Sequence, residues 1–106
     1  MSKKDNIRKL TTFLALSLAH KIGGMTNPKD PYAGKYEKEG DAYFIRSRKV
    51  SFSENWNNYD KIRIREELRK KLKTELERKD FLDNKKFDLM DEEINKTLLS
   101  LDLLSS

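Results

Sequence analysis

Three stretches of the chain carry apolar residues at the spacing of an α-helix. The first runs from about Asp5 to Ile22, where the apolar residues recur every three or four positions (Ile7, Leu10, Leu14, Leu18). Phe13, Leu16 and Ala19 widen this stripe, so we expect the helix to be central to the core. Ser2 or Asp5 can cap its start, and Gly23-Gly24 is expected to end it because glycine readily adopts the left-handed conformation.

Two further helices are predicted in the second half of the chain. One covers about Trp56 to Lys79, with apolar residues at every fourth position (Ile64, Leu68, Leu72, Leu76). The other covers about Asp88 to Leu104, with Asp88 as a candidate N-cap. The connection between them is short, which favours antiparallel neighbours.

The segment between the first two helices shows the weakest helical pattern. Asn27-Pro28, Asp30-Pro31, Gly34 and Gly40 favour turns. We predict a short β-hairpin in which Lys35–Lys38 pairs with Ala42–Arg46. The alternative is a short helix starting at Asp30-Pro31, which would place Tyr32 and Tyr36 one turn apart.

These elements define the predicted fold. Residues 1–106 are expected to form a single small helical domain of the mainly α class. It contains three helices and a short β-hairpin or irregular insertion after the first helix, with an α+β fold as the alternative.

Charge is abundant and unevenly distributed. There are 23 Lys and Arg against 18 Asp and Glu, which gives a net charge of +5. Residues 61–79 contain nine basic and four acidic residues, whereas residues 80–106 contain three basic and seven acidic ones. The predicted second-half helices should therefore pack with opposite net charge and partly neutralise each other.

The sequence gives little support for a catalytic site or a metal-binding site. The chain has no Cys and one His, which excludes disulfide scaffolds and thiolate metal sites. His20 has no nucleophile at a recognised spacing, and we interpret it as a cation at a helix C-terminus. Asp91-Glu92-Glu93 point in different directions on a helix, so we interpret them as matching a helix N-terminus rather than as ligands of one ion. We expect no enzyme activity, cofactor, metal or small-molecule substrate.

The longest apolar stretch is too short to cross a bilayer. It runs from Phe13 to Ala19, whereas a membrane span needs about 20 apolar residues. We therefore expect a cytoplasmic protein with no membrane partner.

The C-terminal stretch carries more apolar residues than one narrow stripe can cover. Seven large apolar residues fall among the fifteen positions from Met90 to Leu104. The surplus can pack on the first helix or on a second chain. We predict a regulatory or protein-interaction module that binds a partner protein or forms a homodimer through an apolar surface made of Met90, Ile94, Leu98, Leu101 and Leu104.

A second interpretation is a small basic accessory protein that binds nucleic acid. Aromatic residues next to Arg and Lys can stack on unpaired bases and hold phosphates. The candidate contacts are Lys3, Lys4, Arg8, Lys9, Tyr43, Phe44, Arg46, Arg48 and Lys49. The basic residues of 61–79 surround their helix instead of gathering on one face, so we interpret that helix as solvated.

Overall fold

The computed structural model describes residues 2–27, 29–79 and 84–104. Within these ranges the chain forms four α-helices and no strand: α1 (Lys3–Thr26), α2 (Ala33–Phe52), α3 (Asn58–Arg78) and α4 (Lys85–Ser100). The mainly α class is therefore confirmed, with four helices in place of the predicted three.

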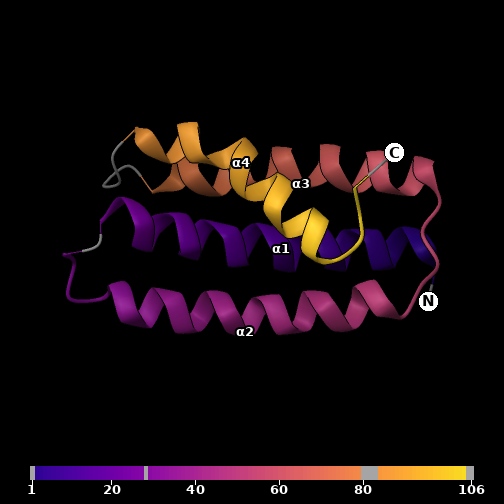
Figure 1. The fold of residues 1–106 in the computed structure, drawn as a ribbon, viewed down its shortest axis with the longest axis horizontal. Coiled ribbons are helices and arrows are strands. Elements are labelled where there is room, and N and C mark those ends of the chain that lie inside the picture. The colour runs from indigo at the N-terminus through magenta and orange to yellow at the C-terminus, as the bar shows by residue number, and fades with distance from the viewer. Residues whose placement is uncertain (1, 28, 80–83, 105–106) are drawn as a thin grey trace.

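Helix α1 lies in the middle of an elongated bundle that measures 40 × 23 × 21 Å (Figure 1). Helix α2 lies along one side of α1, and α3 and α4 lie on the other side. Each helix runs opposite to the one before it in the sequence, so α1 and α3 point the same way. In the described part of the chain, α2 packs on α1 and on neither of the other helices.

Helix α1 is longer than predicted at both ends. Ser2 caps its start, because its hydroxyl accepts a hydrogen bond from the Asp5 N–H at 3.2 Å. Gly23 and Gly24 do not end the helix, which continues to Thr26 with Asn27 as the C-cap. Gly23 is buried, so packing on this turn compensates for the low helix propensity of the two glycines.

The predicted β-hairpin is wrong, because both of its strands and its turn lie within α2. The alternative of a helix starting near Asp30-Pro31 agrees better, and the Asp30 carboxylate accepts a hydrogen bond from the Tyr32 N–H just before the helix. The buried residues of α2 are small (Gly40, Ser47, Ser51), so the helix shows no apolar stripe in its sequence. Gly40 permits a close approach to α1 instead of forming a turn.

Helix α3 agrees with its prediction and has a reciprocal N-terminal cap. The Asn57 side chain accepts from the Asp60 N–H, and the Asp60 carboxylate accepts from the Asn57 N–H. Lys3 also donates to Asp60 at 2.9 Å, which ties the start of α1 to the start of α3. All four members of the predicted stripe are buried (Ile64, Leu68, Leu72, Leu76).

Helix α4 pairs antiparallel with α3, as predicted. Arg69 contacts Asp91 at 3.0 Å, and Arg65 donates to Asn95, which lies further along α4. The helix begins at Lys85 instead of Asp88 and ends at Ser100 instead of Leu104. Asp91-Glu92-Glu93 therefore lie beyond its first turn, and their interpretation as a match for the helix N-terminus is wrong for this structure.

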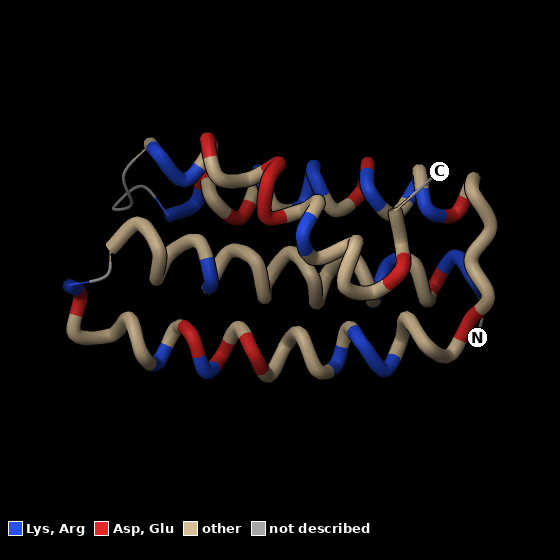
Figure 2. Tube along the Cα trace, viewed as in Figure 1, with Lys and Arg blue, Asp and Glu red and all other residues tan. Residues whose placement is uncertain are grey.

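The first half of α2 mixes acidic and basic residues, including Lys35 and Lys38, whereas the charged residues of its second half are all basic (Figure 2). Its three acidic residues (Glu37, Glu39, Asp41) lie in the first half, and Arg46, Arg48 and Lys49 lie in the second half. Since α1 and α2 are antiparallel, the basic half of α2 lies beside the lysine- and arginine-rich start of α1. The hydrogen bond from the Asn6 side chain to Glu54 marks this end of the bundle.

Candidate docking groove

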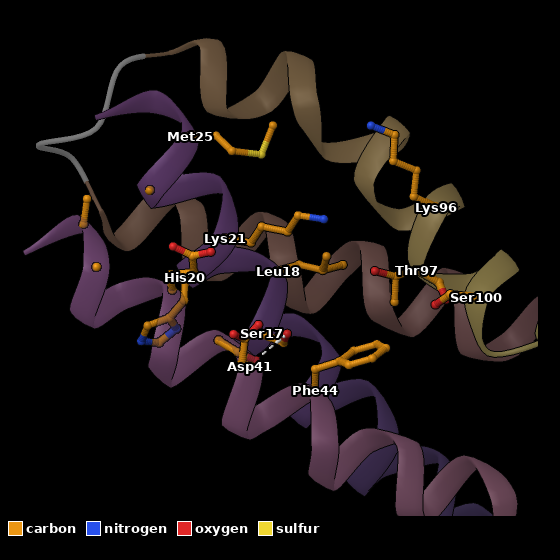
Figure 3. Close-up of a pocket in the computed structure, with 15 residues that line it drawn as sticks. Ser17, Leu18, His20, Lys21, Met25, Asp41, Phe44, Lys96, Thr97 and Ser100 are labelled. Atoms are coloured by element: carbon orange, nitrogen blue, oxygen red, sulfur yellow. Dashed lines mark hydrogen bonds between the residues drawn. The ribbon is translucent and has the colours of Figure 1, made fainter. Parts of the chain in front are cut away.

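A groove of about 600 Å³ lies between α2 and α4, with α1 as its floor (Figure 3). It exists because α2 and α4 both pack on α1 without touching each other. We call it the docking groove. The α1 residues that line it are Ser17, Leu18, His20, Lys21, Gly24 and Met25; α2 and α4 contribute Ala33, Gly34, Glu37, Gly40, Asp41, Phe44, Lys96, Thr97 and Ser100.

The docking groove has apolar side chains on its floor and on its α2 wall. Leu18 belongs to the buried core, and Phe44 extends from α2 into the space between α2 and α4. The Ser17 hydroxyl donates to the Gly40 carbonyl oxygen at 2.8 Å, so its hydrogen-bonding proton is already used. Met25 remains partly exposed at one end of the groove. The floor can therefore bury apolar side chains without leaving the Ser17 donor unpaired.

Two lysines from different helices converge on one buried carboxylate beside the groove. Glu93 is 1% exposed, and its oxygens lie 2.8 Å from Lys21 Nζ and 3.2 Å from Lys96 Nζ. Burial by itself would raise the pKa of Glu93, but the two ammonium groups outweigh this effect and hold the pKa below its ordinary value. The hydrogen bonds that Lys96 donates to the carboxylates of Glu92 and Glu93 raise the pKa of Lys96. The cluster ties α1 to α4 and neutralises the basic wall of the groove.

The opposite wall carries acidic side chains that are not neutralised. Glu37 and Asp41 lie one turn apart on α2, line the groove and are exposed. Within the described ranges, neither carboxylate has a hydrogen bond or ion pair, in contrast to Lys21 and Lys96 across the groove. The available charge of the docking groove is therefore negative.

His20 occupies a structural position that sequence reasoning did not predict. It lies inside α1 instead of at the helix C-terminus. Its Nδ1 lies 2.7 Å from the Leu16 carbonyl oxygen and its Nε2 lies 3.0 Å from a Glu39 carboxylate oxygen. The rings of Tyr36 and Tyr43 stand beside it. The arrangement links α1 to α2 and offers no nucleophile for the imidazole to activate.

The predicted apolar docking surface lies in the interior of the chain. Met90, Ile94, Leu98 and Leu101 are buried, and Leu104 is partly buried against the same core. This location corrects the prediction that these side chains are available to a partner. Apart from Leu99, which is exposed, the apolar residues between Met90 and Leu104 pack in or against the core of the same chain, which was the other option left open by the sequence.

The predicted nucleic-acid contacts are brought to one end of the bundle but not to one face. Lys3, Lys4, Arg8 and Lys9 lie in the first turns of α1, beside the basic half of α2. The Arg46 guanidinium lies 6.0 Å from the Phe13 ring centre and 5.8 Å from that of Tyr43. Arg48 lies 5.5 Å from the ring centre of Phe52. Phe44 points toward the docking groove, and Lys49 is exposed on the outer side of α2.

Sequence reasoning missed the residues that give the docking groove its charge. Glu37 and Asp41 fell within the predicted hairpin, and Glu93 was grouped with its exposed neighbours Asp91 and Glu92. If a helix had been predicted for this segment, the spacing of four residues would have placed Glu37 and Asp41 one turn apart on the same side. This spacing is the feature of the sequence that could have identified them.

Metal and membrane features are absent from the part of the chain that the structure describes. It contains no group of His, Asp and Glu side chains arranged to hold a metal ion. None of its helices combines the length and the apolar character that crossing a bilayer requires. Compared with known proteins, the chain matches no family model, no curated protein and no solved structure.

Proposed function

We propose that this protein is a non-enzymatic interaction module that binds a helical segment of a partner protein in the docking groove. The observation that carries the proposal is the space between α2 and α4, which is lined by Leu18, Met25 and Phe44 and, among the described residues, by two unpaired carboxylates on one wall. The surface predicted from the sequence is buried, so the proposed contact moves from the apolar face of α4 to the groove beside it.

The shape of the groove favours a helical ligand. Both of its walls are helices, and an amphipathic helix can insert side chains at i, i+3, i+4 and i+7 into such a groove. A volume of about 600 Å³ accommodates a few large side chains. Leu18, Met25 and Phe44 would contact the apolar face of the ligand.

The charges of the groove favour a basic ligand. Lys21 and Lys96 are already paired with Glu93, whereas Glu37 and Asp41 have no partner in the part of the chain that the structure describes. A ligand with Lys or Arg beside its apolar face would pair with the acidic wall. Complementary charge of this kind selects partners and increases the rate of association.

The proposal can be tested with a display library of helical peptides in which apolar and charged positions vary. We expect the purified protein to enrich peptides that combine an apolar stripe with Lys or Arg beside it. The Glu37→Lys/Asp41→Lys variant should lose these peptides and select acidic ones. The matched control is Glu66→Lys/Glu77→Lys, which makes the same change of charge at two exposed positions of α3. Enrichment that is the same for all three proteins would refute the docking groove as the binding site.

A second proposal is binding to nucleic acid at the basic end of α1 and α2. It is favoured by the position of Arg46, Arg48 and Lys49 beside the basic first turns of α1. The rings of Tyr43 and Phe52 already lie against arginines, which leaves contact with phosphates as the main source of affinity. Binding should therefore weaken steeply with salt, with similar affinity for different sequences. A fluorescence titration with a labelled single strand that shows no binding at low salt would refute it.

A further inference from the structure

One side of α2 faces away from the rest of the molecule and carries large apolar residues. Ile45 is 56% exposed and Phe52 is 66% exposed. At 100° per residue, Ile45 points about 140° away from Gly40, which faces α1. Because α2 packs on α1 alone, no other helix in the described part of the chain covers this side.

The exposed residues on this side follow the spacing of a coiled-coil seam. Lys38, Asp41, Ile45, Arg48 and Phe52 are separated by alternating steps of three and four residues, and all five are exposed. We call these five residues the α2 seam. They stay within a sector of about 80° around the helix, which is narrow enough for contact with one neighbouring helix.

The α2 seam is complementary to itself when two copies run antiparallel. A twofold axis at Ile45 places Ile45 against Ile45 of the second copy. Lys38 and Phe52, each seven residues from Ile45, then face each other. Asp41 is four residues before Ile45 and Arg48 is three after it, so these two side chains lie one position from direct opposition and within reach of each other. A parallel pair would instead place Asp41 against Asp41 and Arg48 against Arg48, which is repulsive.

We propose that the protein self-associates through antiparallel pairing of α2 with α2 of a second copy. The contact is isologous, so each aspartate–arginine pair forms twice. Arg48 already lies 5.5 Å from the Phe52 ring centre, which restricts its side chain on the seam before association. The pairing requires an acidic seam residue before Ile45 and a basic one after it, and Asp41 and Arg48 meet this requirement.

The predicted dimer is weak. A single pair of helices buries less than the roughly 1,200 Å² that is usual for stable specific interfaces. We therefore expect reversible dimerisation that depends on protein concentration and on salt. This proposal is independent of the docking groove, although Asp41 contributes to both surfaces.

Exchange of the charges tests the pairing. Sedimentation equilibrium of the full chain should show a monomer–dimer equilibrium that weakens about tenfold or more in Asp41→Arg and in Arg48→Asp. The double variant Asp41→Arg/Arg48→Asp should recover dimerisation, because both charge pairs are restored in reverse. The control variants Glu77→Arg and Lys73→Asp change exposed charges of α3 and should leave the equilibrium unchanged. A wild-type protein that stays monomeric, or a double variant that is not restored, would refute the proposal.

Cysteine crosslinking gives a second test that does not depend on the charges. The natural chain contains no Cys, so a single introduced Cys reports one contact. Ile45→Cys should form a disulfide-linked dimer rapidly under mild oxidation. Leu99→Cys, at an exposed position on α4, and Phe52→Cys, on the seam but seven residues from the twofold axis, should crosslink slowly. Equal rates for the three variants would contradict the antiparallel seam.

Discussion

Ser17 of α1 and Gly40 of α2 are in direct contact, because the Ser17 hydroxyl donates to the Gly40 carbonyl oxygen at 2.8 Å. A Cβ atom at Gly40 would lie 3.1 Å from the Ser17 carbonyl oxygen and 3.3 Å from His20 Cβ. Two backbones can come this close only because Gly40 has no side chain.

Substitution of Gly40 should separate the two helices. We expect Gly40→Val to lower the free energy of unfolding by about 1–3 kcal/mol, because the added atoms press against the α1 backbone. Gly34→Ala is the matched control, since nothing lies within 4 Å of a Cβ there. It should be neutral or stabilising by up to about 1 kcal/mol through its higher helix propensity. Urea unfolding of both variants gives the comparison, and equal effects would contradict it.

Adjacent leucines of α4 should respond very differently to truncation. Leu98 is fully buried and Leu99 is 68% exposed. We expect Leu98→Ala to cost about 2–5 kcal/mol through lost burial and the cavity that remains. Leu99→Ala should change stability by less than about 0.5 kcal/mol. Chemical denaturation measures both, and a small effect at Leu98 would contradict its position in the core.

The ion pairs of Glu93 should make stability depend on pH. Burial raises the pKa of Glu93, but Lys21 and Lys96 outweigh it and lower the pKa below 4.5, the ordinary value. The unfolded chain then binds the proton more readily, so the contribution is complete above the unfolded pKa and is lost as pH falls through the folded pKa. The stability difference between wild type and Glu93→Gln should therefore be largest above pH 4.5 and should decrease in more acidic solution.

Urea unfolding at a series of pH values measures this difference. Glu92→Gln is the control, because Glu92 also contacts Lys96 but is exposed, where solvent screens the pair. A Glu93→Gln difference that stays constant with pH would show that the carboxylate contributes by packing instead of by charge.

The cap of α3 should contribute measurably to stability. Asn57→Ala removes the side-chain oxygen that accepts from the Asp60 N–H, at a cost of about 1 kcal/mol. Asn57→Ser keeps an oxygen at that position and should cost little. Thermal unfolding of the two variants compares them, and similar losses would show that the cap is not the reason for the effect.

The sequence predicted three of the four helices because each of them buries an apolar stripe. A helix places apolar residues spaced by four positions on one side, where they can be buried together, so this spacing predicts a helix. The stripe of α3 is the example: Ile64, Leu68, Leu72 and Leu76. Helix α2 could not be recognised in this way, since Gly40, Ser47 and Ser51 face α1 in place of large apolar residues. Its two glycines and its flanking prolines resemble turn signals when read without a partner helix.

The docking groove could not be predicted from the sequence for a related reason. A groove depends on which helix faces remain uncovered, and that follows from packing instead of from any local pattern. The burial of Lys86 could not be predicted either, because its sequence context suggests an ordinary surface lysine. In the fold it is buried and donates to the Lys79 carbonyl oxygen at the end of α3. The burial of Glu93 could not be predicted from the sequence either, because it depends on the ion pair with Lys21, which the fold brings from α1.

The attachment of α2 to α1 alone has a consequence for local opening of the molecule. The fully buried residues of α2 are small or polar, and its large apolar contacts with the core, Phe44 and Val50, are only partly buried. We therefore expect detachment of α2 to expose less apolar surface than detachment of α3 or α4, whose apolar stripes are fully buried. We expect the backbone amides of α2 to exchange with deuterium through openings that leave the remaining helices folded. Amides in the middle of α1 should exchange only when the whole chain unfolds. Helix α2 would then be the first part of the protein to fray as denaturant is added, well before the core is lost.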